Sequence, residues 1–291
     1  DLAGSDALIT KLQQQIASGT RLAQPSDDPV AAAQAVRLSS AQSAISSFRA
    51  AGTDATRFLG VADSTLGSMN TALQRVAQLG TSAVNATNDA TSNSAIASEI
   101  GSLRDQLASL ANADSGVAGQ SLFGGFAATA VTNSGGTWSY VGDAGAVNRQ
   151  LDSSTTMTIN DYGSGTAGGA DLFGFTAGAG NDVFSVLDQL ATAVAAGNTA
   201  GINAAQTSLA ARTSTILEAR GVVGAQEARI TSTQTVLATV SNANAAQLSS
   251  LQDTDVAQAA LQLSQAQTGY QAALSVAARV GSLPSLADFL R

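Results

Sequence analysis

Apolar residues recur every seven positions between residues 29 and 84. Two rows, offset by three residues, carry the pattern: Ala31, Leu38, Ile45, Gly52, Leu59, Leu66, Leu73 and Gly80, then Gln34, Ala41, Phe48, Ala55, Ala62, Met69, Val76 and Ala83. Such rows are typical of the a and d positions of a coiled coil. They predict one helix roughly 80 Å long, at 1.5 Å per residue. Gly52 and Gly80 interrupt the first row, where glycine costs about 1 kcal/mol relative to alanine, and they indicate close helix approaches or bends.

The start of this helix is marked by Pro25-Ser-Asp-Asp-Pro29. Asp28 can act as the N-cap, and Pro29 fits the first helical position because its missing N–H has no helical partner there. Asp27 and Asp28 also lie at the positive end of the helix dipole. Arg21 is positioned to pair with either carboxylate, a surface contact that contributes no more than about 1 kcal/mol.

Further helical patterns precede and follow this segment. A short helix is predicted from Leu8, Leu12 and Ile16 and ends at Ser18-Gly19, and a third helix ends near Asn112. Another spans about 182–196. A second seven-residue row then runs through Ile202, Leu209, Ile216, Val223, Ile230, Leu237, Asn244 and Leu251. Its one polar member, Asn244, is of the kind that can fix helix register. The helix is expected to continue with shifted phase through Val256, Leu263, Tyr270 and Leu274 until Gly281.

The middle of the chain has a different composition. Residues 115–181 hold 15 of the 28 glycines and the only tryptophan. Thr137–Val141, Val147–Leu151 and Thr155–Ile159 alternate in the manner of strands. We therefore expect a mainly α protein with a β-rich insertion: an N-terminal helical arm (1–114), a glycine-rich β domain (115–181) and a C-terminal helical arm (182–291). The two long coiled-coil arms would run antiparallel, with the small outer β domain at their far tip.

Composition restricts the chemistry. The chain has no cysteine and no histidine, so disulfides, thiol nucleophiles, Cys/His zinc sites and histidine bases are excluded. Charged residues make up 12% of the chain, aromatics 4%, and the net charge is −8. Lys11 is the only lysine, so the basic cluster that nucleic acids and anionic membranes require is missing. No stretch approaches the 18 apolar residues that membrane insertion needs.

Two local patterns could carry other functions. Gly168-Gly-Ala-Asp-Leu-Phe173, with Gly178 to Asp182, faintly resembles a calcium-binding nonapeptide repeat, but that architecture needs several stacked copies. The carboxylate pairs Asp27/Asp28 and Asp253/Asp255 could in principle do acid–base work. No phosphate loop, nucleophile elbow or zinc helix is present, so we expect no enzyme, no metal and no cofactor.

The heptads leave two readings open. They could form the core of one four-helix bundle, or they could pack against copies of the same chain. The helices are longer than an ordinary globular helix, and the apolar rows are narrow. Both features favour helices that need partners.

Four stretches resemble the flagellin superfamily of bacteria, and more sharply its hook-associated members at the hook–filament junction. They are Ser18-Gly-Thr-Arg21 with Pro25–Pro29; Leu103-Arg-Asp-Gln-Leu107 with Leu110-Ala-Asn112 and Leu122-Phe-Gly-Gly125; Tyr140-Val-Gly142; and Asp253-Thr-Asp-Val-Ala-Gln-Ala259 with Leu263-Ser-Gln265 and Tyr270-Gln-Ala-Ala-Leu274. The family has a longer apolar lead before the Ser-Gly step, so the first helix is expected to be truncated or unusually short.

The resemblance implies a structural adaptor that is exported through the flagellar secretion channel and acts outside the cell on the flagellum. Its implied partners are copies of itself in a ring, a neighbouring hook-associated protein, flagellin and an export chaperone, without nucleic acid or membrane insertion. Assembly and packing are expected to fall on Pro25, Asp27, Asp28, Leu59, Leu66, Leu73, Ile230, Leu237, Leu251, Asp255, Leu263, Leu286, Phe289 and Leu290. One alternative is a flagellin, the filament subunit itself. A more distant one is a secreted glycan- or calcium-binding module centred on residues 115–181.

Overall fold

The computed structural model describes residues 2–22, 24–84, 89–117, 119–162, 168–178 and 180–281. It divides into two compact units, which we call the terminal unit (1–46 and 237–291) and the central unit (47–236). The expected three-part division at 114/115 and 181/182 follows composition rather than packing, and it stays a prediction.

The fold is mainly helical, as the sequence predicts. Its helices are α1 (Leu2–Ser18), α2 (Pro29–Val84), α3 (Ala90–Ala111), α4 (Ala170–Phe173), the 3₁₀ helix η1 (Phe175–Ala177), α5 (Val183–Ala195), α6 (Thr199–Gln252) and α7 (Val256–Gly281). Aspartates cap α3 and α5, because Asp89 accepts from the N–H of Ser92 and Asp182 from that of Ser185. Gly197, with a φ of 64°, lies in the turn before α6.

Within the described part of the β insertion, four short strands form two separate antiparallel hairpins. β1 (Val131–Ser134) pairs with β2 (Thr137–Tyr140), and β3 (Asn148–Gln150) pairs with β4 (Thr156–Thr158). Three of these strands fall within the predicted segments. Strand β1 was not predicted, because its sequence Val-Thr-Asn-Ser contains one apolar residue and no alternation of apolar and polar residues. Its position is instead fixed from outside: the side chain of Asn112 accepts from the N–H groups of Ala130 and Val131 and donates to the carbonyl of Val131.

The prediction that the last helix runs on unbroken from residue 251 is wrong. The chain leaves the helix at Asp253 and restarts it at Val256. The side chain of Asp255 accepts from the N–H of Gln258 at 3.1 Å and so begins α7 as an N-cap. The freed backbone groups bind elsewhere: the N–H of Thr254 donates to the carbonyl of Gly19, outside the helix.

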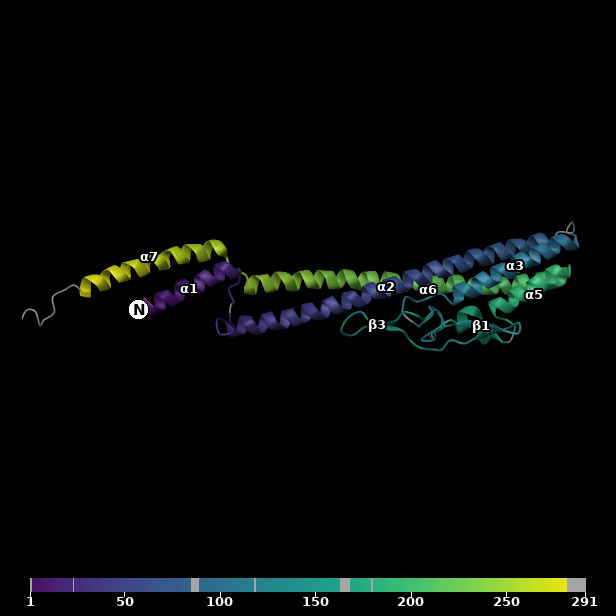
Figure 1. Cartoon of the computed structure of the whole chain (residues 1–291), viewed down its shortest axis with the longest axis horizontal. Helices are drawn as coiled ribbons and strands as arrows, with labels where there is room; N and C mark the ends of the chain where they lie inside the picture. The colour runs from purple at the N-terminus through teal and green to yellow at the C-terminus, as the bar shows by residue number, and fades with distance from the viewer. Residues whose placement is uncertain are drawn as a thin grey trace, which may run out of the picture. The chain divides into compact units, whose positions relative to one another are not determined.

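The hydrophobic core lies in the central unit. All 38 residues of the main buried cluster fall between Ala55 and Ile230. Within this unit α2 and α6 run antiparallel, because Asp63 pairs with Arg220 while Arg49 contacts Gln234. Figure 1 shows α3 and α5 beside them.

The β insertion lies against the long helices rather than at their far tip, which corrects the sequence expectation. Arg149 of β3 binds Asp54 of α2 at 2.7 Å, and Gln226 of α6 donates to the carbonyl of Asp161 at 3.2 Å. Phe123 and Phe173 of the insertion pack into the same core as the helices. The position of the insertion is determined by apolar packing against the helices, and the alternating pattern of the strands does not predict which helices they contact.

In the terminal unit, α1 and α7 lie side by side (Figure 1). Thr20 forms a β-bridge with Asp253, so the C-terminal end of α1 meets the N-terminal end of α7 and the two helices run antiparallel. Among the residues of this unit that the structure describes, six apolar ones are buried: Leu12, Ala31, Ala35, Ile45, Leu237 and Ala259. Across the residues that the structure describes, no helix has both the length and the apolar content needed to cross a membrane.

Candidate assembly site

A small hydrogen-bonded joint in the terminal unit links the segment after α1 to the end of α6. The N–H of Arg21 donates to the carbonyl of Gln252 at 2.6 Å, and the N–H of Thr254 donates to the carbonyl of Gly19 at 2.9 Å. Gly19 has a φ of 69°, a left-handed conformation that favours glycine. The joint therefore brings together two of the stretches that carry the family resemblance, the one that begins with Ser18-Gly-Thr-Arg21 and the one that begins at Asp253.

The Arg21 side chain crosses the same joint. Its Nη2 donates to the carbonyl of Leu251 at 2.9 Å, while its Nη1 lies 3.9 Å from the Asp28 carboxylate. The predicted pairing with an aspartate is thus present but long. The contact with Leu251 is shorter, and it satisfies a carbonyl in the last turn of α6.

Asp28 has the predicted capping role. Its Oδ1 accepts from the N–H of Ala31 at 3.0 Å, and α2 begins at Pro29. Asp27 has a different role: it accepts from the N–H of Gln24 at 3.0 Å and forms an ion pair with Lys11 of α1 at 2.8 Å. The two adjacent carboxylates therefore fix the loop from both sides.

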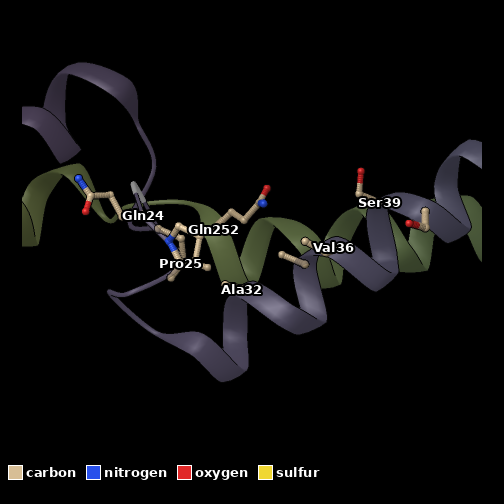
Figure 2. Close-up of a pocket in the computed structure, with 9 residues that line it drawn as sticks. Gln24, Pro25, Ala32, Val36, Ser39 and Gln252 are labelled. Atoms are coloured by element: carbon tan, nitrogen blue, oxygen red, sulfur yellow. The ribbon is translucent and has the colours of Figure 1, made fainter.

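A groove of about 330 Å³ lies beside the joint. Figure 2 shows Gln24 and Pro25 from the loop, Gln252 from α6, and Ala32, Val36 and Ser39 from α2 around it. Pro25 is exposed, and 66% of Val36 is exposed. The loop signature thus forms one wall of an open, partly apolar surface.

Exposed apolar side chains gather in the terminal unit. This unit holds about a third of the chain but eight of the thirteen large apolar residues that are exposed in the described ranges: Leu8, Val30, Val36, Val240, Val256, Leu261, Leu274 and Val276. The second heptad row of α2, which begins at Gln34, explains part of this concentration of exposed apolar residues. Its members Gln34 and Ala41 are exposed in the terminal unit, whereas its members from Ala55 onward are buried. A two-helix contact can bury only one apolar face of each helix.

The predicted seam residues divide between the two units. Leu59, Leu66, Leu73 and Ile230 are fully buried in the central unit, and Leu237 is buried in the terminal unit. Their packing is therefore within the chain, since α2 and α6 serve as each other's partners. Leu251 and Leu263 are half-buried, and Asp255 is an exposed helix cap. Leu286, Phe289 and Leu290 lie outside the described residues.

Other motifs of the resemblance have structural roles in the β insertion. The Tyr140 hydroxyl donates to the carbonyl of Phe123 at 2.9 Å and accepts from the N–H of Gly169 at 3.1 Å. Burial raises the pKa of Tyr140. In the turn between β3 and β4, bonds from Ser154 and Thr155 lower the pKa of Asp152 to about 2. These groups hold loops together.

Sequence reasoning missed several exposed apolar residues of α7 in the terminal unit. Leu261 and Val276 lie off the row through Leu263, Tyr270 and Leu274, which is why a row-based search passes over them. The signal that would have found them is the second apolar face of α7. In the described ranges, no three His, Cys, Asp or Glu side chains come together in a group that could hold a metal ion.

Comparison with known families places the chain. The bacterial flagellin N-terminal helical region matches residues 2–128, and the bacterial flagellin C-terminal helical region matches residues 199–290. Together these regions span about three quarters of the sequence. The chain belongs to the bacterial flagellin family, and it is a flagellin-like structural component of the flagellum.

Within this family the chain is similar to hook-associated proteins. It is 36% identical over 163 residues to flagellar hook-associated protein 3 of Salmonella typhimurium, covering 56% of this chain and 51% of that protein. The protein of the same name from Escherichia coli is 36% identical over 162 residues, with the same shares. The chain thus spans about half the length of the curated relatives it matches.

Solved structures show the same fold. A protein from Vibrio parahaemolyticus described as flagellar hook-associated superposes with a TM-score of 0.70 at 18% identity, covering 78% of this chain and all of that one. Xanthomonas campestris FlgL superposes with a TM-score of 0.60 at 20% identity, covering 72% of this chain and 98% of that one. The long helices with a small β insertion are therefore a shared architecture.

Proposed function

We propose that this chain is a structural adaptor subunit that assembles at the hook–filament junction and templates filament growth, with no catalytic role. The observation that carries the proposal is the contrast between the two units. The central unit has a continuous core, whereas the terminal unit leaves eight large apolar side chains exposed. Similarity to hook-associated proteins points to the class of partner that would cover them.

The energetics favour assembly through the terminal unit. Burying a large aliphatic side chain completely contributes about 1.5–3 kcal/mol relative to leaving it exposed. Several such residues on α7 would therefore supply a substantial driving force once a neighbouring helix covers them. In this proposal the neighbours are copies of the same chain in a ring, with another hook-associated protein on one side and flagellin on the other.

The predicted assembly residues have separate parts in this picture. Pro25, Asp27 and Asp28 shape the loop beside the groove, and Leu263 contributes to the α7 face. Leu286, Phe289 and Leu290 are proposed to make further contacts between subunits. The subunit would reach its place outside the cell as an unfolded chain, through the flagellar secretion channel and with an export chaperone.

The direct test removes apolar contacts without disturbing the fold. Leu261→Ser with Leu274→Ser should give a folded protein that fails to join purified junctions, because both side chains are about half exposed or more. Leu217→Ser is the matched control, since Leu217 is 47% exposed but belongs to the central unit. Normal motility of cells that carry only the double variant would refute the assignment of assembly to α7.

A second measurement separates the adaptor from the flagellin alternative. A filament subunit would dominate a sheared flagellar preparation, whereas a junction subunit would be a trace band. Gold-labelled antibody against this chain should then mark one short zone between hook and filament in electron micrographs. Labelling along the whole filament would assign the chain to the filament itself.

A further inference from the structure

The apolar rows of α2 and α6 do not by themselves define one pairing in the central unit. Leu59, Leu66 and Leu73 repeat at seven residues on α2, and Ile216, Val223 and Ile230 do the same on α6. A slip of one heptad would again place leucine beside isoleucine or valine. Some further feature must distinguish the observed register from its neighbours.

Two contacts between glycine and glutamine interrupt these rows. A Cβ added at Gly52 would lie 1.8 Å from Nε2 of Gln234, and one added at Gly80 would lie 2.6 Å from Nε2 of Gln206. Both glycines are buried, so each amide occupies space that any other residue on α2 would fill. Gln234 also donates to the carbonyl of Arg49 at 3.0 Å, which fixes its end against the α2 backbone.

The two contacts are spaced identically on both helices. Gly52 and Gly80 are 28 residues apart, and so are Gln206 and Gln234. This separation equals four heptads, so both contacts can form together in an antiparallel pair. Each glycine thus meets a glutamine side chain of the opposing helix, and the expectation that Gly52 and Gly80 mark close helix approaches or bends stays a prediction.

A slip of one heptad in either direction would destroy both contacts. In one direction Gln234 would face Leu59, and in the other Gln206 would face Leu73; both leucines are fully buried. A glutamine amide would then be pressed against a packed apolar side chain. The leucine leaves no space for the amide, and Gln234 would also lose its bond to the carbonyl of Arg49. For Gln206 the cost is steric alone, because its Nε2 is buried without a hydrogen-bond partner in the observed register as well.

We propose that the two glutamine–glycine contacts, Gln234 with Gly52 and Gln206 with Gly80, select the single register of α2 against α6. The apolar rows supply adhesion that is nearly equal in several registers, and the glutamine–glycine contacts supply the main difference between them. The Asp63–Arg220 ion pair between the same helices is partly exposed and contributes no more than about 1 kcal/mol. The inference concerns the central unit alone and does not depend on the proposed function.

The chain is suited to a direct register measurement because it contains no cysteine. Gly60→Cys with Glu227→Cys places two thiols across the observed register, since a Cβ at Gly60 would lie 4.0 Å from the Glu227 carboxylate. Gly67→Cys with Glu227→Cys and Thr53→Cys with Glu227→Cys report the two one-heptad slips. Each full-length variant is refolded from denaturant and treated with a short thiol-reactive cross-linker.

The register-selecting contacts are then removed by Gly52→Ala, Gly80→Ala, Gln206→Ala and Gln234→Ala together. With the contacts intact, only the Gly60/Glu227 pair should cross-link. In the fourfold alanine background a slipped pair should cross-link to an extent comparable with the native pair. Cross-linking of the native pair alone, in a fourfold variant with unchanged helix content, would overturn the proposal and assign the register to the β insertion.

A milder variant decides the matter if the fourfold variant does not fold. Gln206→Ala with Gln234→Ala keeps both glycines, adds no atoms and removes both amides. It should also admit a slipped cross-link, though less of it, because the glycines still leave empty space. If it too cross-links only at the native pair, the amides do not select the register.

Discussion

Gly60 and Gly52 offer a matched pair of substitutions with opposite surroundings on one helix. Gly60 is exposed, and the atom outside its own helix that a Cβ there would meet first is a Glu227 carboxylate oxygen, at an ordinary 4.0 Å. Gly60→Ala should therefore show the full helix-propensity gain of alanine, about 1 kcal/mol. At Gly52 the added Cβ would overlap Nε2 of Gln234 at 1.8 Å, so this side chain must move.

The magnitude for Gly52→Ala follows from what Gln234 loses. Displacing it breaks its 3.0 Å bond to the carbonyl of Arg49, a net loss of about 1 kcal/mol. The carbonyl keeps a partner, because Thr53 also donates to it, and no larger desolvation penalty is expected. The loss cancels the propensity gain, so Gly52→Ala should be neutral or mildly destabilising. The two alanine variants should differ by about 1–2 kcal/mol.

The assay is urea unfolding followed by tryptophan fluorescence. Trp138 is the only tryptophan and lies in the central unit, stacked on Phe184 at 4.8 Å, so its signal reports the unit that carries both glycines. The slope of each transition should be unchanged, and only the midpoint should shift. Equal stabilisation by Gly52→Ala and Gly60→Ala would show that Gln234 does not occupy the space above Gly52, and the reasoning would fail.

Three further outcomes follow from single contacts. Asp28→Ala should destabilise the terminal unit by about 1 kcal/mol in thermal unfolding followed by circular dichroism, because α2 loses its N-cap; Asp28→Asn, which can still cap, should retain most of the stability. Bonds from Arg57 and Arg149 lower the pKa of Asp54 below its ordinary 3.8. The contribution of Asp54 to stability should therefore be fully present above pH 3.8 and be lost as the pH falls through the lowered pKa. An Asp54→Asn variant should show no such loss in parallel urea titrations. Trp138→Phe keeps an aromatic ring but removes the 2.8 Å bond from the indole N–H to a carboxylate of α5, and should destabilise the central unit by about 1–2 kcal/mol by circular dichroism; no change would show that the bond is dispensable.

Local chemistry made the helix ends predictable from the sequence. Asp28 and Pro29 mark the start of α2, and Asn112 and Gly197 lie at the ends of α3 and α5. These ends could be predicted because helix capping depends on residues within one or two turns. The first heptad row of α2, which includes Leu59, Leu66 and Leu73, was also predictable, because its seven-residue period can be read from the sequence of one helix.

Features that depend on distant residues could not be predicted. The break at 253–255 requires the carbonyl of Gly19 as an acceptor for Thr254, and nothing near residue 254 indicates this partner. The capping role of Asp255 could be recognised only once the break was known. Likewise, Gln206 and Gln234 look like ordinary polar positions until the opposing helix supplies a glycine.

The joint at Gly19–Arg21 also has a kinetic consequence. Its bond from Arg21 to Leu251 connects residues 230 positions apart, so it closes a loop that contains the whole central unit. Loop-closure entropy makes such a contact late to form unless the intervening chain has already become compact. The central unit should therefore fold first, and the joint should close last. Because the joint has few buried apolar contacts, it should also open first, and amide hydrogen exchange at Arg21 and Thr254, whose N–H groups donate across the joint, should be well ahead of exchange at the centre of α2.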